Sequence, residues 1–248
     1  IRDMAINYSN LVLMDKEVGK IINQLKDDGL YEETYIFFYS DHGGPFPRQK
    51  RAIYESGTKV PMLVKFPGSK NAGKTDDRLL SFVDFAPTIL NIAGVNIPDF
   101  LEGKAFIGQN QPKERDFLIT TSDRFDGQFD RIRAIQTKNF KLIKNYYTNM
   151  SHNLDVRYRK NMPMMQRLNT LYVEKKLNEN QQKWFNIRDD YEFYNLKDDP
   201  YELNNLFYDN QYSTIISNFK YELSDWIVAT KDQGERSEFD IIYESTLR

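Results

Sequence analysis

The fold is decided by residues 35–44, Tyr-Ile-Phe-Phe-Tyr-Ser-Asp-His-Gly-Gly, where an apolar run stops at an acid, an imidazole and two glycines. The run is aromatic and β-branched without alternating polar residues, which predicts a strand covered on both faces, as in parallel sheets flanked by helices. Ligands bind beyond the carboxyl ends of such strands. Asp41 and His42 therefore lie where a site is expected, and Gly43 and Gly44 allow the backbone to turn sharply.

Asp41 and His42 place an oxygen donor and a nitrogen donor side by side, which favours a divalent cation. In the alternative interpretation, Asp41 caps the following turn and His42 is a polar loop residue. Lys50 belongs to a basic loop and reaches the same place if that loop folds back. A metal beside a lysine suits an anionic tetrahedral ester, because the lysine stabilises charge on the leaving oxygen. In the alternative interpretation, Lys50 belongs to a solvated basic loop with no role in catalysis.

Hydrophobic periodicity predicts an amphipathic helix from Met4 to Leu25, a second strand from Val60 to Phe66 and a helix from Asp84 to Gly94. After Pro98 the pattern changes to that of a smaller α+β part with an antiparallel sheet, so we expect two domains, 1–110 and 111–248. The elements predicted for the second part are a strand over 117–121, a hairpin of 132–135 with 140–147, helices over 162–177 and 181–185, an edge strand over 191–196 and a last helix over 212–229.

Composition narrows the classes of function. Lys and Arg number 34 against 36 Asp and Glu, a net charge of −2, so nucleic acid is not an expected partner. The chain has no cysteine, which excludes disulfides, zinc thiolate sites and a cysteine nucleophile within it. No apolar run is long enough for a membrane span. Because the sequence starts at Ile1 in helical periodicity without a Met, we expect an internal or C-terminal piece of a longer protein.

Four motifs together resemble the type I sulfatases of the alkaline phosphatase superfamily. The resemblance rests on Ser-Asp-His-Gly at 40–43 with Lys-Arg-Ala-Ile-Tyr-Glu-Ser-Gly-Thr-Lys-Val-Pro at 50–61, the helix of 11–30, Phe-Val-Asp-Phe-Ala-Pro-Thr-Ile-Leu at 82–90, and residues 192–206. It covers nearly the whole chain and looks most like the sulfamidase-related and bacterial glycan sulfatases. It implies the C-terminal part of a three-layer α/β/α sheet followed by an α+β subdomain.

The resemblance also implies roles for individual residues. Asp41 and His42 match two ligands of a divalent metal, usually Ca²⁺, and Lys50 matches the lysine that contacts the substrate sulfate and assists departure of the alcohol oxygen. The turn from Tyr54 to Gly57 would position the loop without performing chemistry. Apart from the resemblance, His152 lies in a polar stretch and is a candidate substrate contact or a surface residue rather than a metal ligand. The expected substrate is a sulfated carbohydrate, and the expected location is the periplasm, the exterior or a lysosome-like compartment.

The chain departs from the family pattern because it has no Cys/Ser-x-Pro-x-Arg motif, whose first residue becomes the formylglycine nucleophile. We therefore expect the formylglycine in a part of the protein upstream of residue 1. We also expect that N-terminal half to be a partner of this chain. One alternative is a phosphodiesterase or phosphonate hydrolase of the same superfamily. The other is a catalytically inactive homologue that binds sulfated glycans through Arg157, Arg159 and Lys160. Specificity is expected from residues 123–133 and 152–160.

Overall fold

The computed structural model describes residues 2–109, 111–236 and 239. The chain divides into two compact units that each draw on two stretches of sequence. The first unit contains Ile1–Thr75 and His152–Asn186, and the second contains Asp76–Ser151 and Ile187–Arg248. The domain boundary predicted at residues 110 and 111 stays a prediction. Among the described helices, none combines the length and the apolar character needed to cross a membrane.

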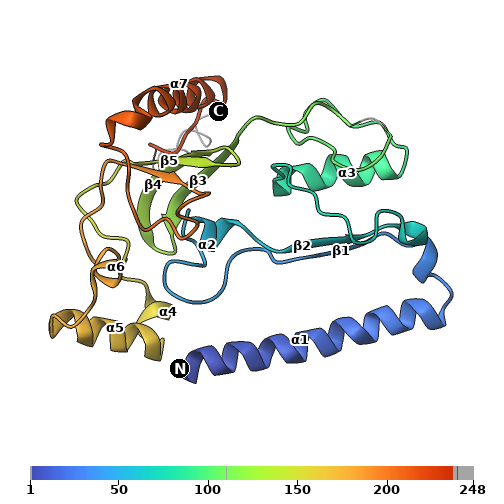
Figure 1. Cartoon of the computed structure of the whole chain (residues 1–248), viewed down its shortest axis with the longest axis horizontal. Helices are drawn as coiled ribbons and strands as arrows, with labels where there is room; N and C mark the ends of the chain where they lie inside the picture. The colour runs from blue at the N-terminus through green and yellow to red at the C-terminus, as the bar shows by residue number, and fades with distance from the viewer. Residues whose placement is uncertain (1, 110, 237–238, 240–248) are drawn as a thin grey trace. The chain divides into compact units, whose positions relative to one another are not determined.

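The first unit begins with α1, Arg2–Asp27, which confirms the predicted amphipathic helix (Figure 1). Gly29 ends it with a left-handed φ of 72°, and the Leu30 amide donates to the carbonyl of Leu25 at 2.9 Å. None of the helix's described residues is buried. Its exposed large apolar side chains are Met4, Ile6, Tyr8, Leu11, Val12, Leu13, Met14 and Ile21.

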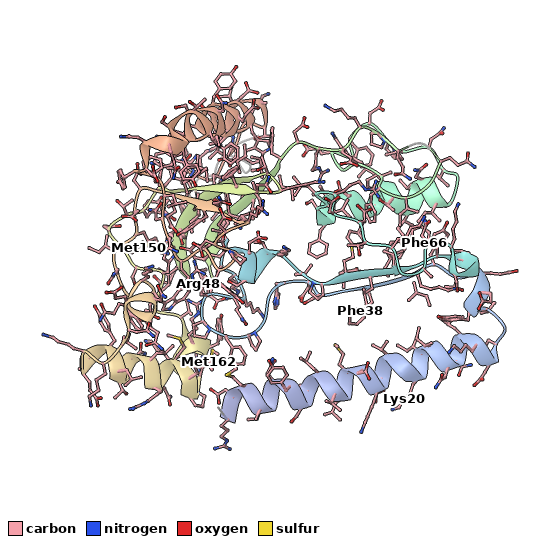
Figure 2. The ribbon with its side chains drawn as sticks, viewed as in Figure 1. Lys20, Phe38, Arg48, Phe66, Met150 and Met162 are labelled. Carbon is pink, nitrogen blue, oxygen red and sulfur yellow. The ribbon has the colours of Figure 1, made fainter. Side chains whose placement is uncertain are left out.

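The strand predicted from residues 35–39 is β1, Ile36–Tyr39, and it pairs with β2, Met62–Lys65 (Figure 1). The pair is antiparallel, and β1 is half-buried rather than covered on both faces. Among the described residues β1 has no parallel neighbour, contrary to the expectation from its apolar run. The reason is that the loop between the two strands brings the chain back to the carboxyl end of β1. Strand β2 therefore starts beside Tyr39 and runs along β1 in the opposite direction. Phe38 on β1 and Phe66 just after β2 are labelled in Figure 2.

Short helices complete the first unit. The Met164 amide, in the first turn of α5, donates to Oδ2 of Asp3 at 2.9 Å, so an α1 carboxylate caps α5. Asn178 and Gln181 form a reciprocal capping box at the start of α6. The elements are η1, Tyr31–Glu33; α2, Glu55–Thr58; η2, Pro67–Ser69; α4, Arg157–Lys160; α5, Pro163–Val173; and α6, Glu179–Gln182.

The second unit is built on a four-stranded antiparallel sheet in the order β3-β4-β5-β6. Its strands are β3, Leu118–Phe125; β4, Gln128–Gln136; β5, Phe140–Asn145; and β6, Tyr191–Asn195. The predicted hairpin around Lys138 and Asn139 is confirmed as β4 and β5, and β6 lies at the sheet's edge as predicted.

The last predicted helix, α7, Ser213–Ala229, packs on one face of this sheet (Figure 1). The sheet contributes one buried residue from each of three neighbouring strands, Ile135, Leu142 and Phe193, and these are in register. The helix contributes Ile216, Phe219 and Leu223, at the spacing of one helical face. The remaining elements are η3, Phe82–Asp84; α3, Phe85–Ile92; and η4, Asn210–Tyr212.

Candidate functional site

Asp41 and His42 lie in the turn directly after β1, as the sequence predicts. The Ser40 hydroxyl donates to the His42 carbonyl at 2.6 Å and so fixes the turn. The Asp41 side chain is 82% exposed and the His42 side chain 37% exposed. The carboxylate is therefore open to a ligand, whereas the imidazole is partly held by the protein.

The ring of His42 has a defined orientation. Its Nδ1 lies 2.7 Å from the Gly43 carbonyl, and a carbonyl oxygen only accepts, so Nδ1 carries the hydrogen. In the neutral ring, Nε2 then presents its lone pair, 3.4 Å from Oδ2 of Asp41. Two electron-rich atoms that face each other favour a cation between or beside them. Orientation of one imidazole nitrogen by a carbonyl is also the usual arrangement around metal-binding histidines.

The donor chemistry of this pair fits a divalent cation, for which Asp41 and His42 would supply two ligands. A hard cation such as Ca²⁺ takes about six to eight oxygen ligands, so the pair makes up part of a coordination shell. Within the described residues, no group of three or more His, Asp or Glu side chains gathers in a way that could hold a metal.

The loop after His42 folds back on itself. Lys50 can reach Asp41 and His42 only if the loop takes such a path. The Gly43 amide donates to the Gly57 carbonyl at 2.9 Å, and the Lys50 amide donates to the Gly44 carbonyl at 2.9 Å. A Cβ on Gly43 would lie 1.9 Å from the Ser56 carbonyl oxygen, and one on Gly57 would lie 2.1 Å from that of Ala52. Only glycine allows the backbones to approach so closely.

Lys50 lies between two strained residues. Arg48 and Arg51 have φ angles of 63° and 67°, in the left-handed region, which costs on the order of 1–3 kcal/mol for each non-glycine residue. The Arg48 guanidinium lies 3.7 Å from the ring centroid of Tyr54. Arg48 is labelled in the loop between β1 and α2 in Figure 2. The Lys50 side chain is half-buried, and its ammonium has no hydrogen bond or ion pair with any described residue.

His152, the candidate substrate contact, lies in the same unit as this loop. Its Nε2 is 3.0 Å from the Tyr54 hydroxyl, and its ring stacks on Trp184 with centroids 5.9 Å apart and 22° between the planes. The Arg159 guanidinium donates to the His152 carbonyl at 3.4 Å. The structure thus brings His152 to Tyr54, four residues beyond Lys50.

Sequence reasoning missed the cluster that surrounds His152. Tyr54 is 4% exposed and Trp184 8% exposed, and the Arg159 guanidinium lies 4.8 Å from the Trp184 ring. Trp184 is one of two tryptophans in the chain, but no spacing in the sequence links it to His152. Arg159, expected as a glycan contact in the binding alternative, is buried, with 4% of its surface exposed. Lys160 is exposed and pairs with Asp155 at 2.7 Å.

The chain is similar to known proteins in sequence and in fold. Residues 3–95 match the family model named Sulfatase. The chain is 44% identical over 242 residues to an ulvan-active sulfatase of Formosa agariphila, covering 97% of this chain and 41% of the relative. It is 25% identical over 248 residues to the N-sulphoglucosamine sulphohydrolase of Homo sapiens, covering 93% of this chain and 48% of the relative.

A solved structure is similar to this chain in fold. It is a complex of a protein with its substrate D-glucosamine-2-N,6-O-disulfate, and it matches with a TM-score of 0.66 at 23% identity. The match covers 92% of this chain and 41% of that chain. The chain spans between two fifths and one half of the length of the curated relatives described above.

Proposed function

We propose that the chain is the C-terminal part of a sulfatase-family enzyme that hydrolyses carbohydrate sulfate esters or sulfamates, because residues 3–95 match the Sulfatase family model and its relatives include an ulvan-active sulfatase and an N-sulphoglucosamine sulphohydrolase. The alkaline phosphatase-like α/β fold of the solved match supports the proposal. The substrate class is suggested by the relatives' names. The nucleophile, a formylglycine, would come from the N-terminal half of the same protein, and the enzyme would work in the periplasm, outside the cell or in a lysosome-like compartment.

In this proposal Asp41 and His42 hold a divalent cation, Ca²⁺ by analogy with the family. A cation bound there would neutralise the oxygens of the substrate's sulfate group. The Gly43 carbonyl keeps hydrogen on Nδ1 of His42, so Nε2 stays available as a ligand. Lys50 donates a proton or hydrogen bond to the alcohol oxygen as the bond from sulfur to that oxygen breaks.

The observation that carries the proposal is the return of the loop. The hydrogen bond from the Lys50 amide to the Gly44 carbonyl places the lysine backbone beside the turn that contains Asp41 and His42. The ammonium has no partner among the described residues, so it is available to an anion. Backbone strain at both flanking arginines is the kind of strain that clusters at functional sites.

The test measures sulfate release by the full-length protein from a sulfated sugar and from 4-nitrophenyl sulfate. Replacement of an electrostatic donor to the reacting oxygen costs on the order of 10²–10³ in kcat. We expect Lys50→Ala to lose that much on the sugar sulfate and less on 4-nitrophenyl sulfate, whose leaving oxygen needs little stabilisation. The matched control is Lys59→Ala, because the Lys59 side chain is 78% exposed and lies 3.8 Å from Glu55.

Two results would overturn the proposed activity, and a third would overturn the role of Lys50. If the wild-type protein releases the alcohol from a phosphonate monoester or a phosphodiester, leaving the free phosphonate or the phosphate monoester, but releases no sulfate, the alternative of phosphoryl-group hydrolysis holds instead. If it binds sulfated glycans but hydrolyses nothing, the inactive homologue is correct. A Lys50→Ala variant that matches Lys59→Ala on both substrates would remove Lys50 from the mechanism.

A further inference from the structure

We propose that Tyr54 and His152 form a positioning pair that fixes the loop carrying Lys50, and thereby couples segment 152–160 to the leaving-group step. This inference rests on the proposed function, because it gives the pair a role only if Lys50 acts on the leaving oxygen. Neither residue is proposed to touch the substrate's sulfate.

Tyr54 anchors the loop with both its backbone and its side chain. Its carbonyl accepts from the amides of Gly57 at 2.8 Å and Thr58 at 3.0 Å, and from the Thr58 hydroxyl at 3.1 Å. Its ring lies under the Arg48 guanidinium, two residues before Lys50. Its hydroxyl meets Nε2 of His152 at 3.0 Å. Lys50 is thus bracketed by Arg48 and Tyr54, which contact each other.

His152 is a firm anchor because its ring and its backbone are both held. The ring stacks on the buried Trp184, and it meets the Tyr54 ring edge-on at 5.5 Å and 63°. The His152 carbonyl accepts from Arg159, and the next amide, of Asn153, donates to the Trp184 carbonyl at 3.1 Å. A side chain that is held at several points transmits its position to whatever it contacts.

The hydrogen bond between Tyr54 and His152 joins residues 98 positions apart. Without it the Lys50 loop would lose one of its side-chain links to segment 152–160, where the Arg51 guanidinium also lies 5.4 Å from the ring centroid of Tyr158. A misplacement of about 1 Å at a catalytic group can cost up to about 10²-fold in rate. The structure therefore makes segment 152–160 a determinant of how well Lys50 meets the leaving oxygen.

The experiment uses the full-length protein with Tyr54→Phe and His152→Phe, which keep an aromatic ring and remove the hydrogen bond. We expect each to lower kcat on the sugar sulfate about tenfold, with a smaller loss on 4-nitrophenyl sulfate and with KM little changed. The double variant should be no slower than either single variant. In a Lys50→Ala background, Tyr54→Phe should have no further effect. The control is Tyr172→Phe, whose ring is 46% exposed and stacks on Phe185.

Equal losses on both substrates would overturn the inference, since a merely structural role acts on every substrate alike. Additive losses in the Lys50→Ala background would overturn it too, and so would unchanged kinetics in both single variants. If Lys50→Ala behaves as proposed and the Tyr54 and His152 variants do not, the inference alone fails. If the wild-type protein releases no sulfate, the proposed function and the inference fail together.

Discussion

Nη1 of Arg188 lies 2.6 and 2.8 Å from the two carboxylate oxygens of Asp130, and their side chains are 2% and 4% exposed. Asp130 belongs to β4. Arg188 precedes β6, and its amide and guanidinium also donate to the carbonyls of Met150 and Ser151, at 3.2 and 3.1 Å. The pair therefore ties the chain's return toward β6 to the middle of the sheet.

Asp130→Asn should destabilise the second unit, because it leaves the Arg188 guanidinium charged and buried without its carboxylate. Breaking one side of such a pair costs about 3–5 kcal/mol. Urea denaturation of the full-length protein measures the loss. The double variant Asp130→Leu/Arg188→Met should recover most of it, since no buried charge remains.

The control for this prediction is Asp116→Asn, because the Asp116 side chain is 83% exposed and 3.6 Å from Lys113. It should change the free energy of unfolding by less than about 0.5 kcal/mol. A loss in Asp130→Asn no larger than this would show that the buried pair does not stabilise the unit.

Asp232 offers a prediction on pH, because two arginines surround it. Arg133 donates to it from Nη2 at 2.7 Å and from Nε at 3.0 Å, and Arg131 lies 3.3 Å away. Burial alone would raise the pKa of the Asp232 carboxyl. The hydrogen bonds from Arg133 and the Gly234 amide, with the charges of the arginines, outweigh burial and lower this pKa below its ordinary value of 3.8.

A carboxyl with a lowered pKa in the folded state stabilises the fold above its unfolded pKa and loses this effect as pH falls through the folded pKa. Asp232→Asn should therefore cost about 1–3 kcal/mol at neutral pH. The difference from wild type should shrink progressively below pH 3.8. Denaturation curves at neutral pH and below pH 3.8 test this prediction. The control is Asp225→Asn, at an exposed position on α7. A difference that is constant with pH would contradict the assignment.

Gly57→Ala tests the close approach inside the Lys50 loop. The added methyl group would fall 2.1 Å from the Ala52 carbonyl oxygen, so the loop must open. We expect loss of most activity of the full-length enzyme, with a cost in stability of roughly 1–3 kcal/mol. The matched control is Gly127→Ala, at which a Cβ meets no atom within 4 Å. Equal activity in the two variants would mean that the loop tolerates displacement.

Replacement of Asp41 by alanine should remove most of the stabilisation by a divalent cation. A ligand present at about 100 times its dissociation constant stabilises the folded state by about 2.7 kcal/mol. Thermal unfolding of the chelated full-length protein, with and without added Ca²⁺ or Mn²⁺, should show this shift in wild type and lose most of it in Asp41→Ala. The control is Asp99→Ala, an exposed acid of the second unit. An undiminished shift in Asp41→Ala would exclude Asp41 as a ligand.

The local elements could be predicted because their signals are local. The end of α1 at Gly29, the hairpin around Lys138 and Asn139, and the turn after β1 all follow from residues within one or two turns of chain. The direction of β2 could not be predicted, because an apolar run indicates that a strand is buried but not whether the neighbouring strand is parallel or antiparallel to it. Pairing is settled by the path of the loop.

The candidate site was predictable to the same extent. Asp41, His42 and Lys50 lie within ten residues of one another, and the glycines between them predict the turn. The contact between Tyr54 and His152 spans 98 residues and depends on Trp184 behind the imidazole. A pattern within one stretch of sequence does not encode such a long-range contact.

The backbone crossing at Gly43 and Gly57 has a consequence for protein engineering. On the proposed function, a mutant library designed to accept new sugars should keep both glycines, since each clashes with a carbonyl once it acquires a side chain. Diversity belongs instead at exposed positions such as Asp155 and Arg157, which lie on either side of the buried Val156. Selection there would redesign the outer surface while every library member inherits an intact lysine loop.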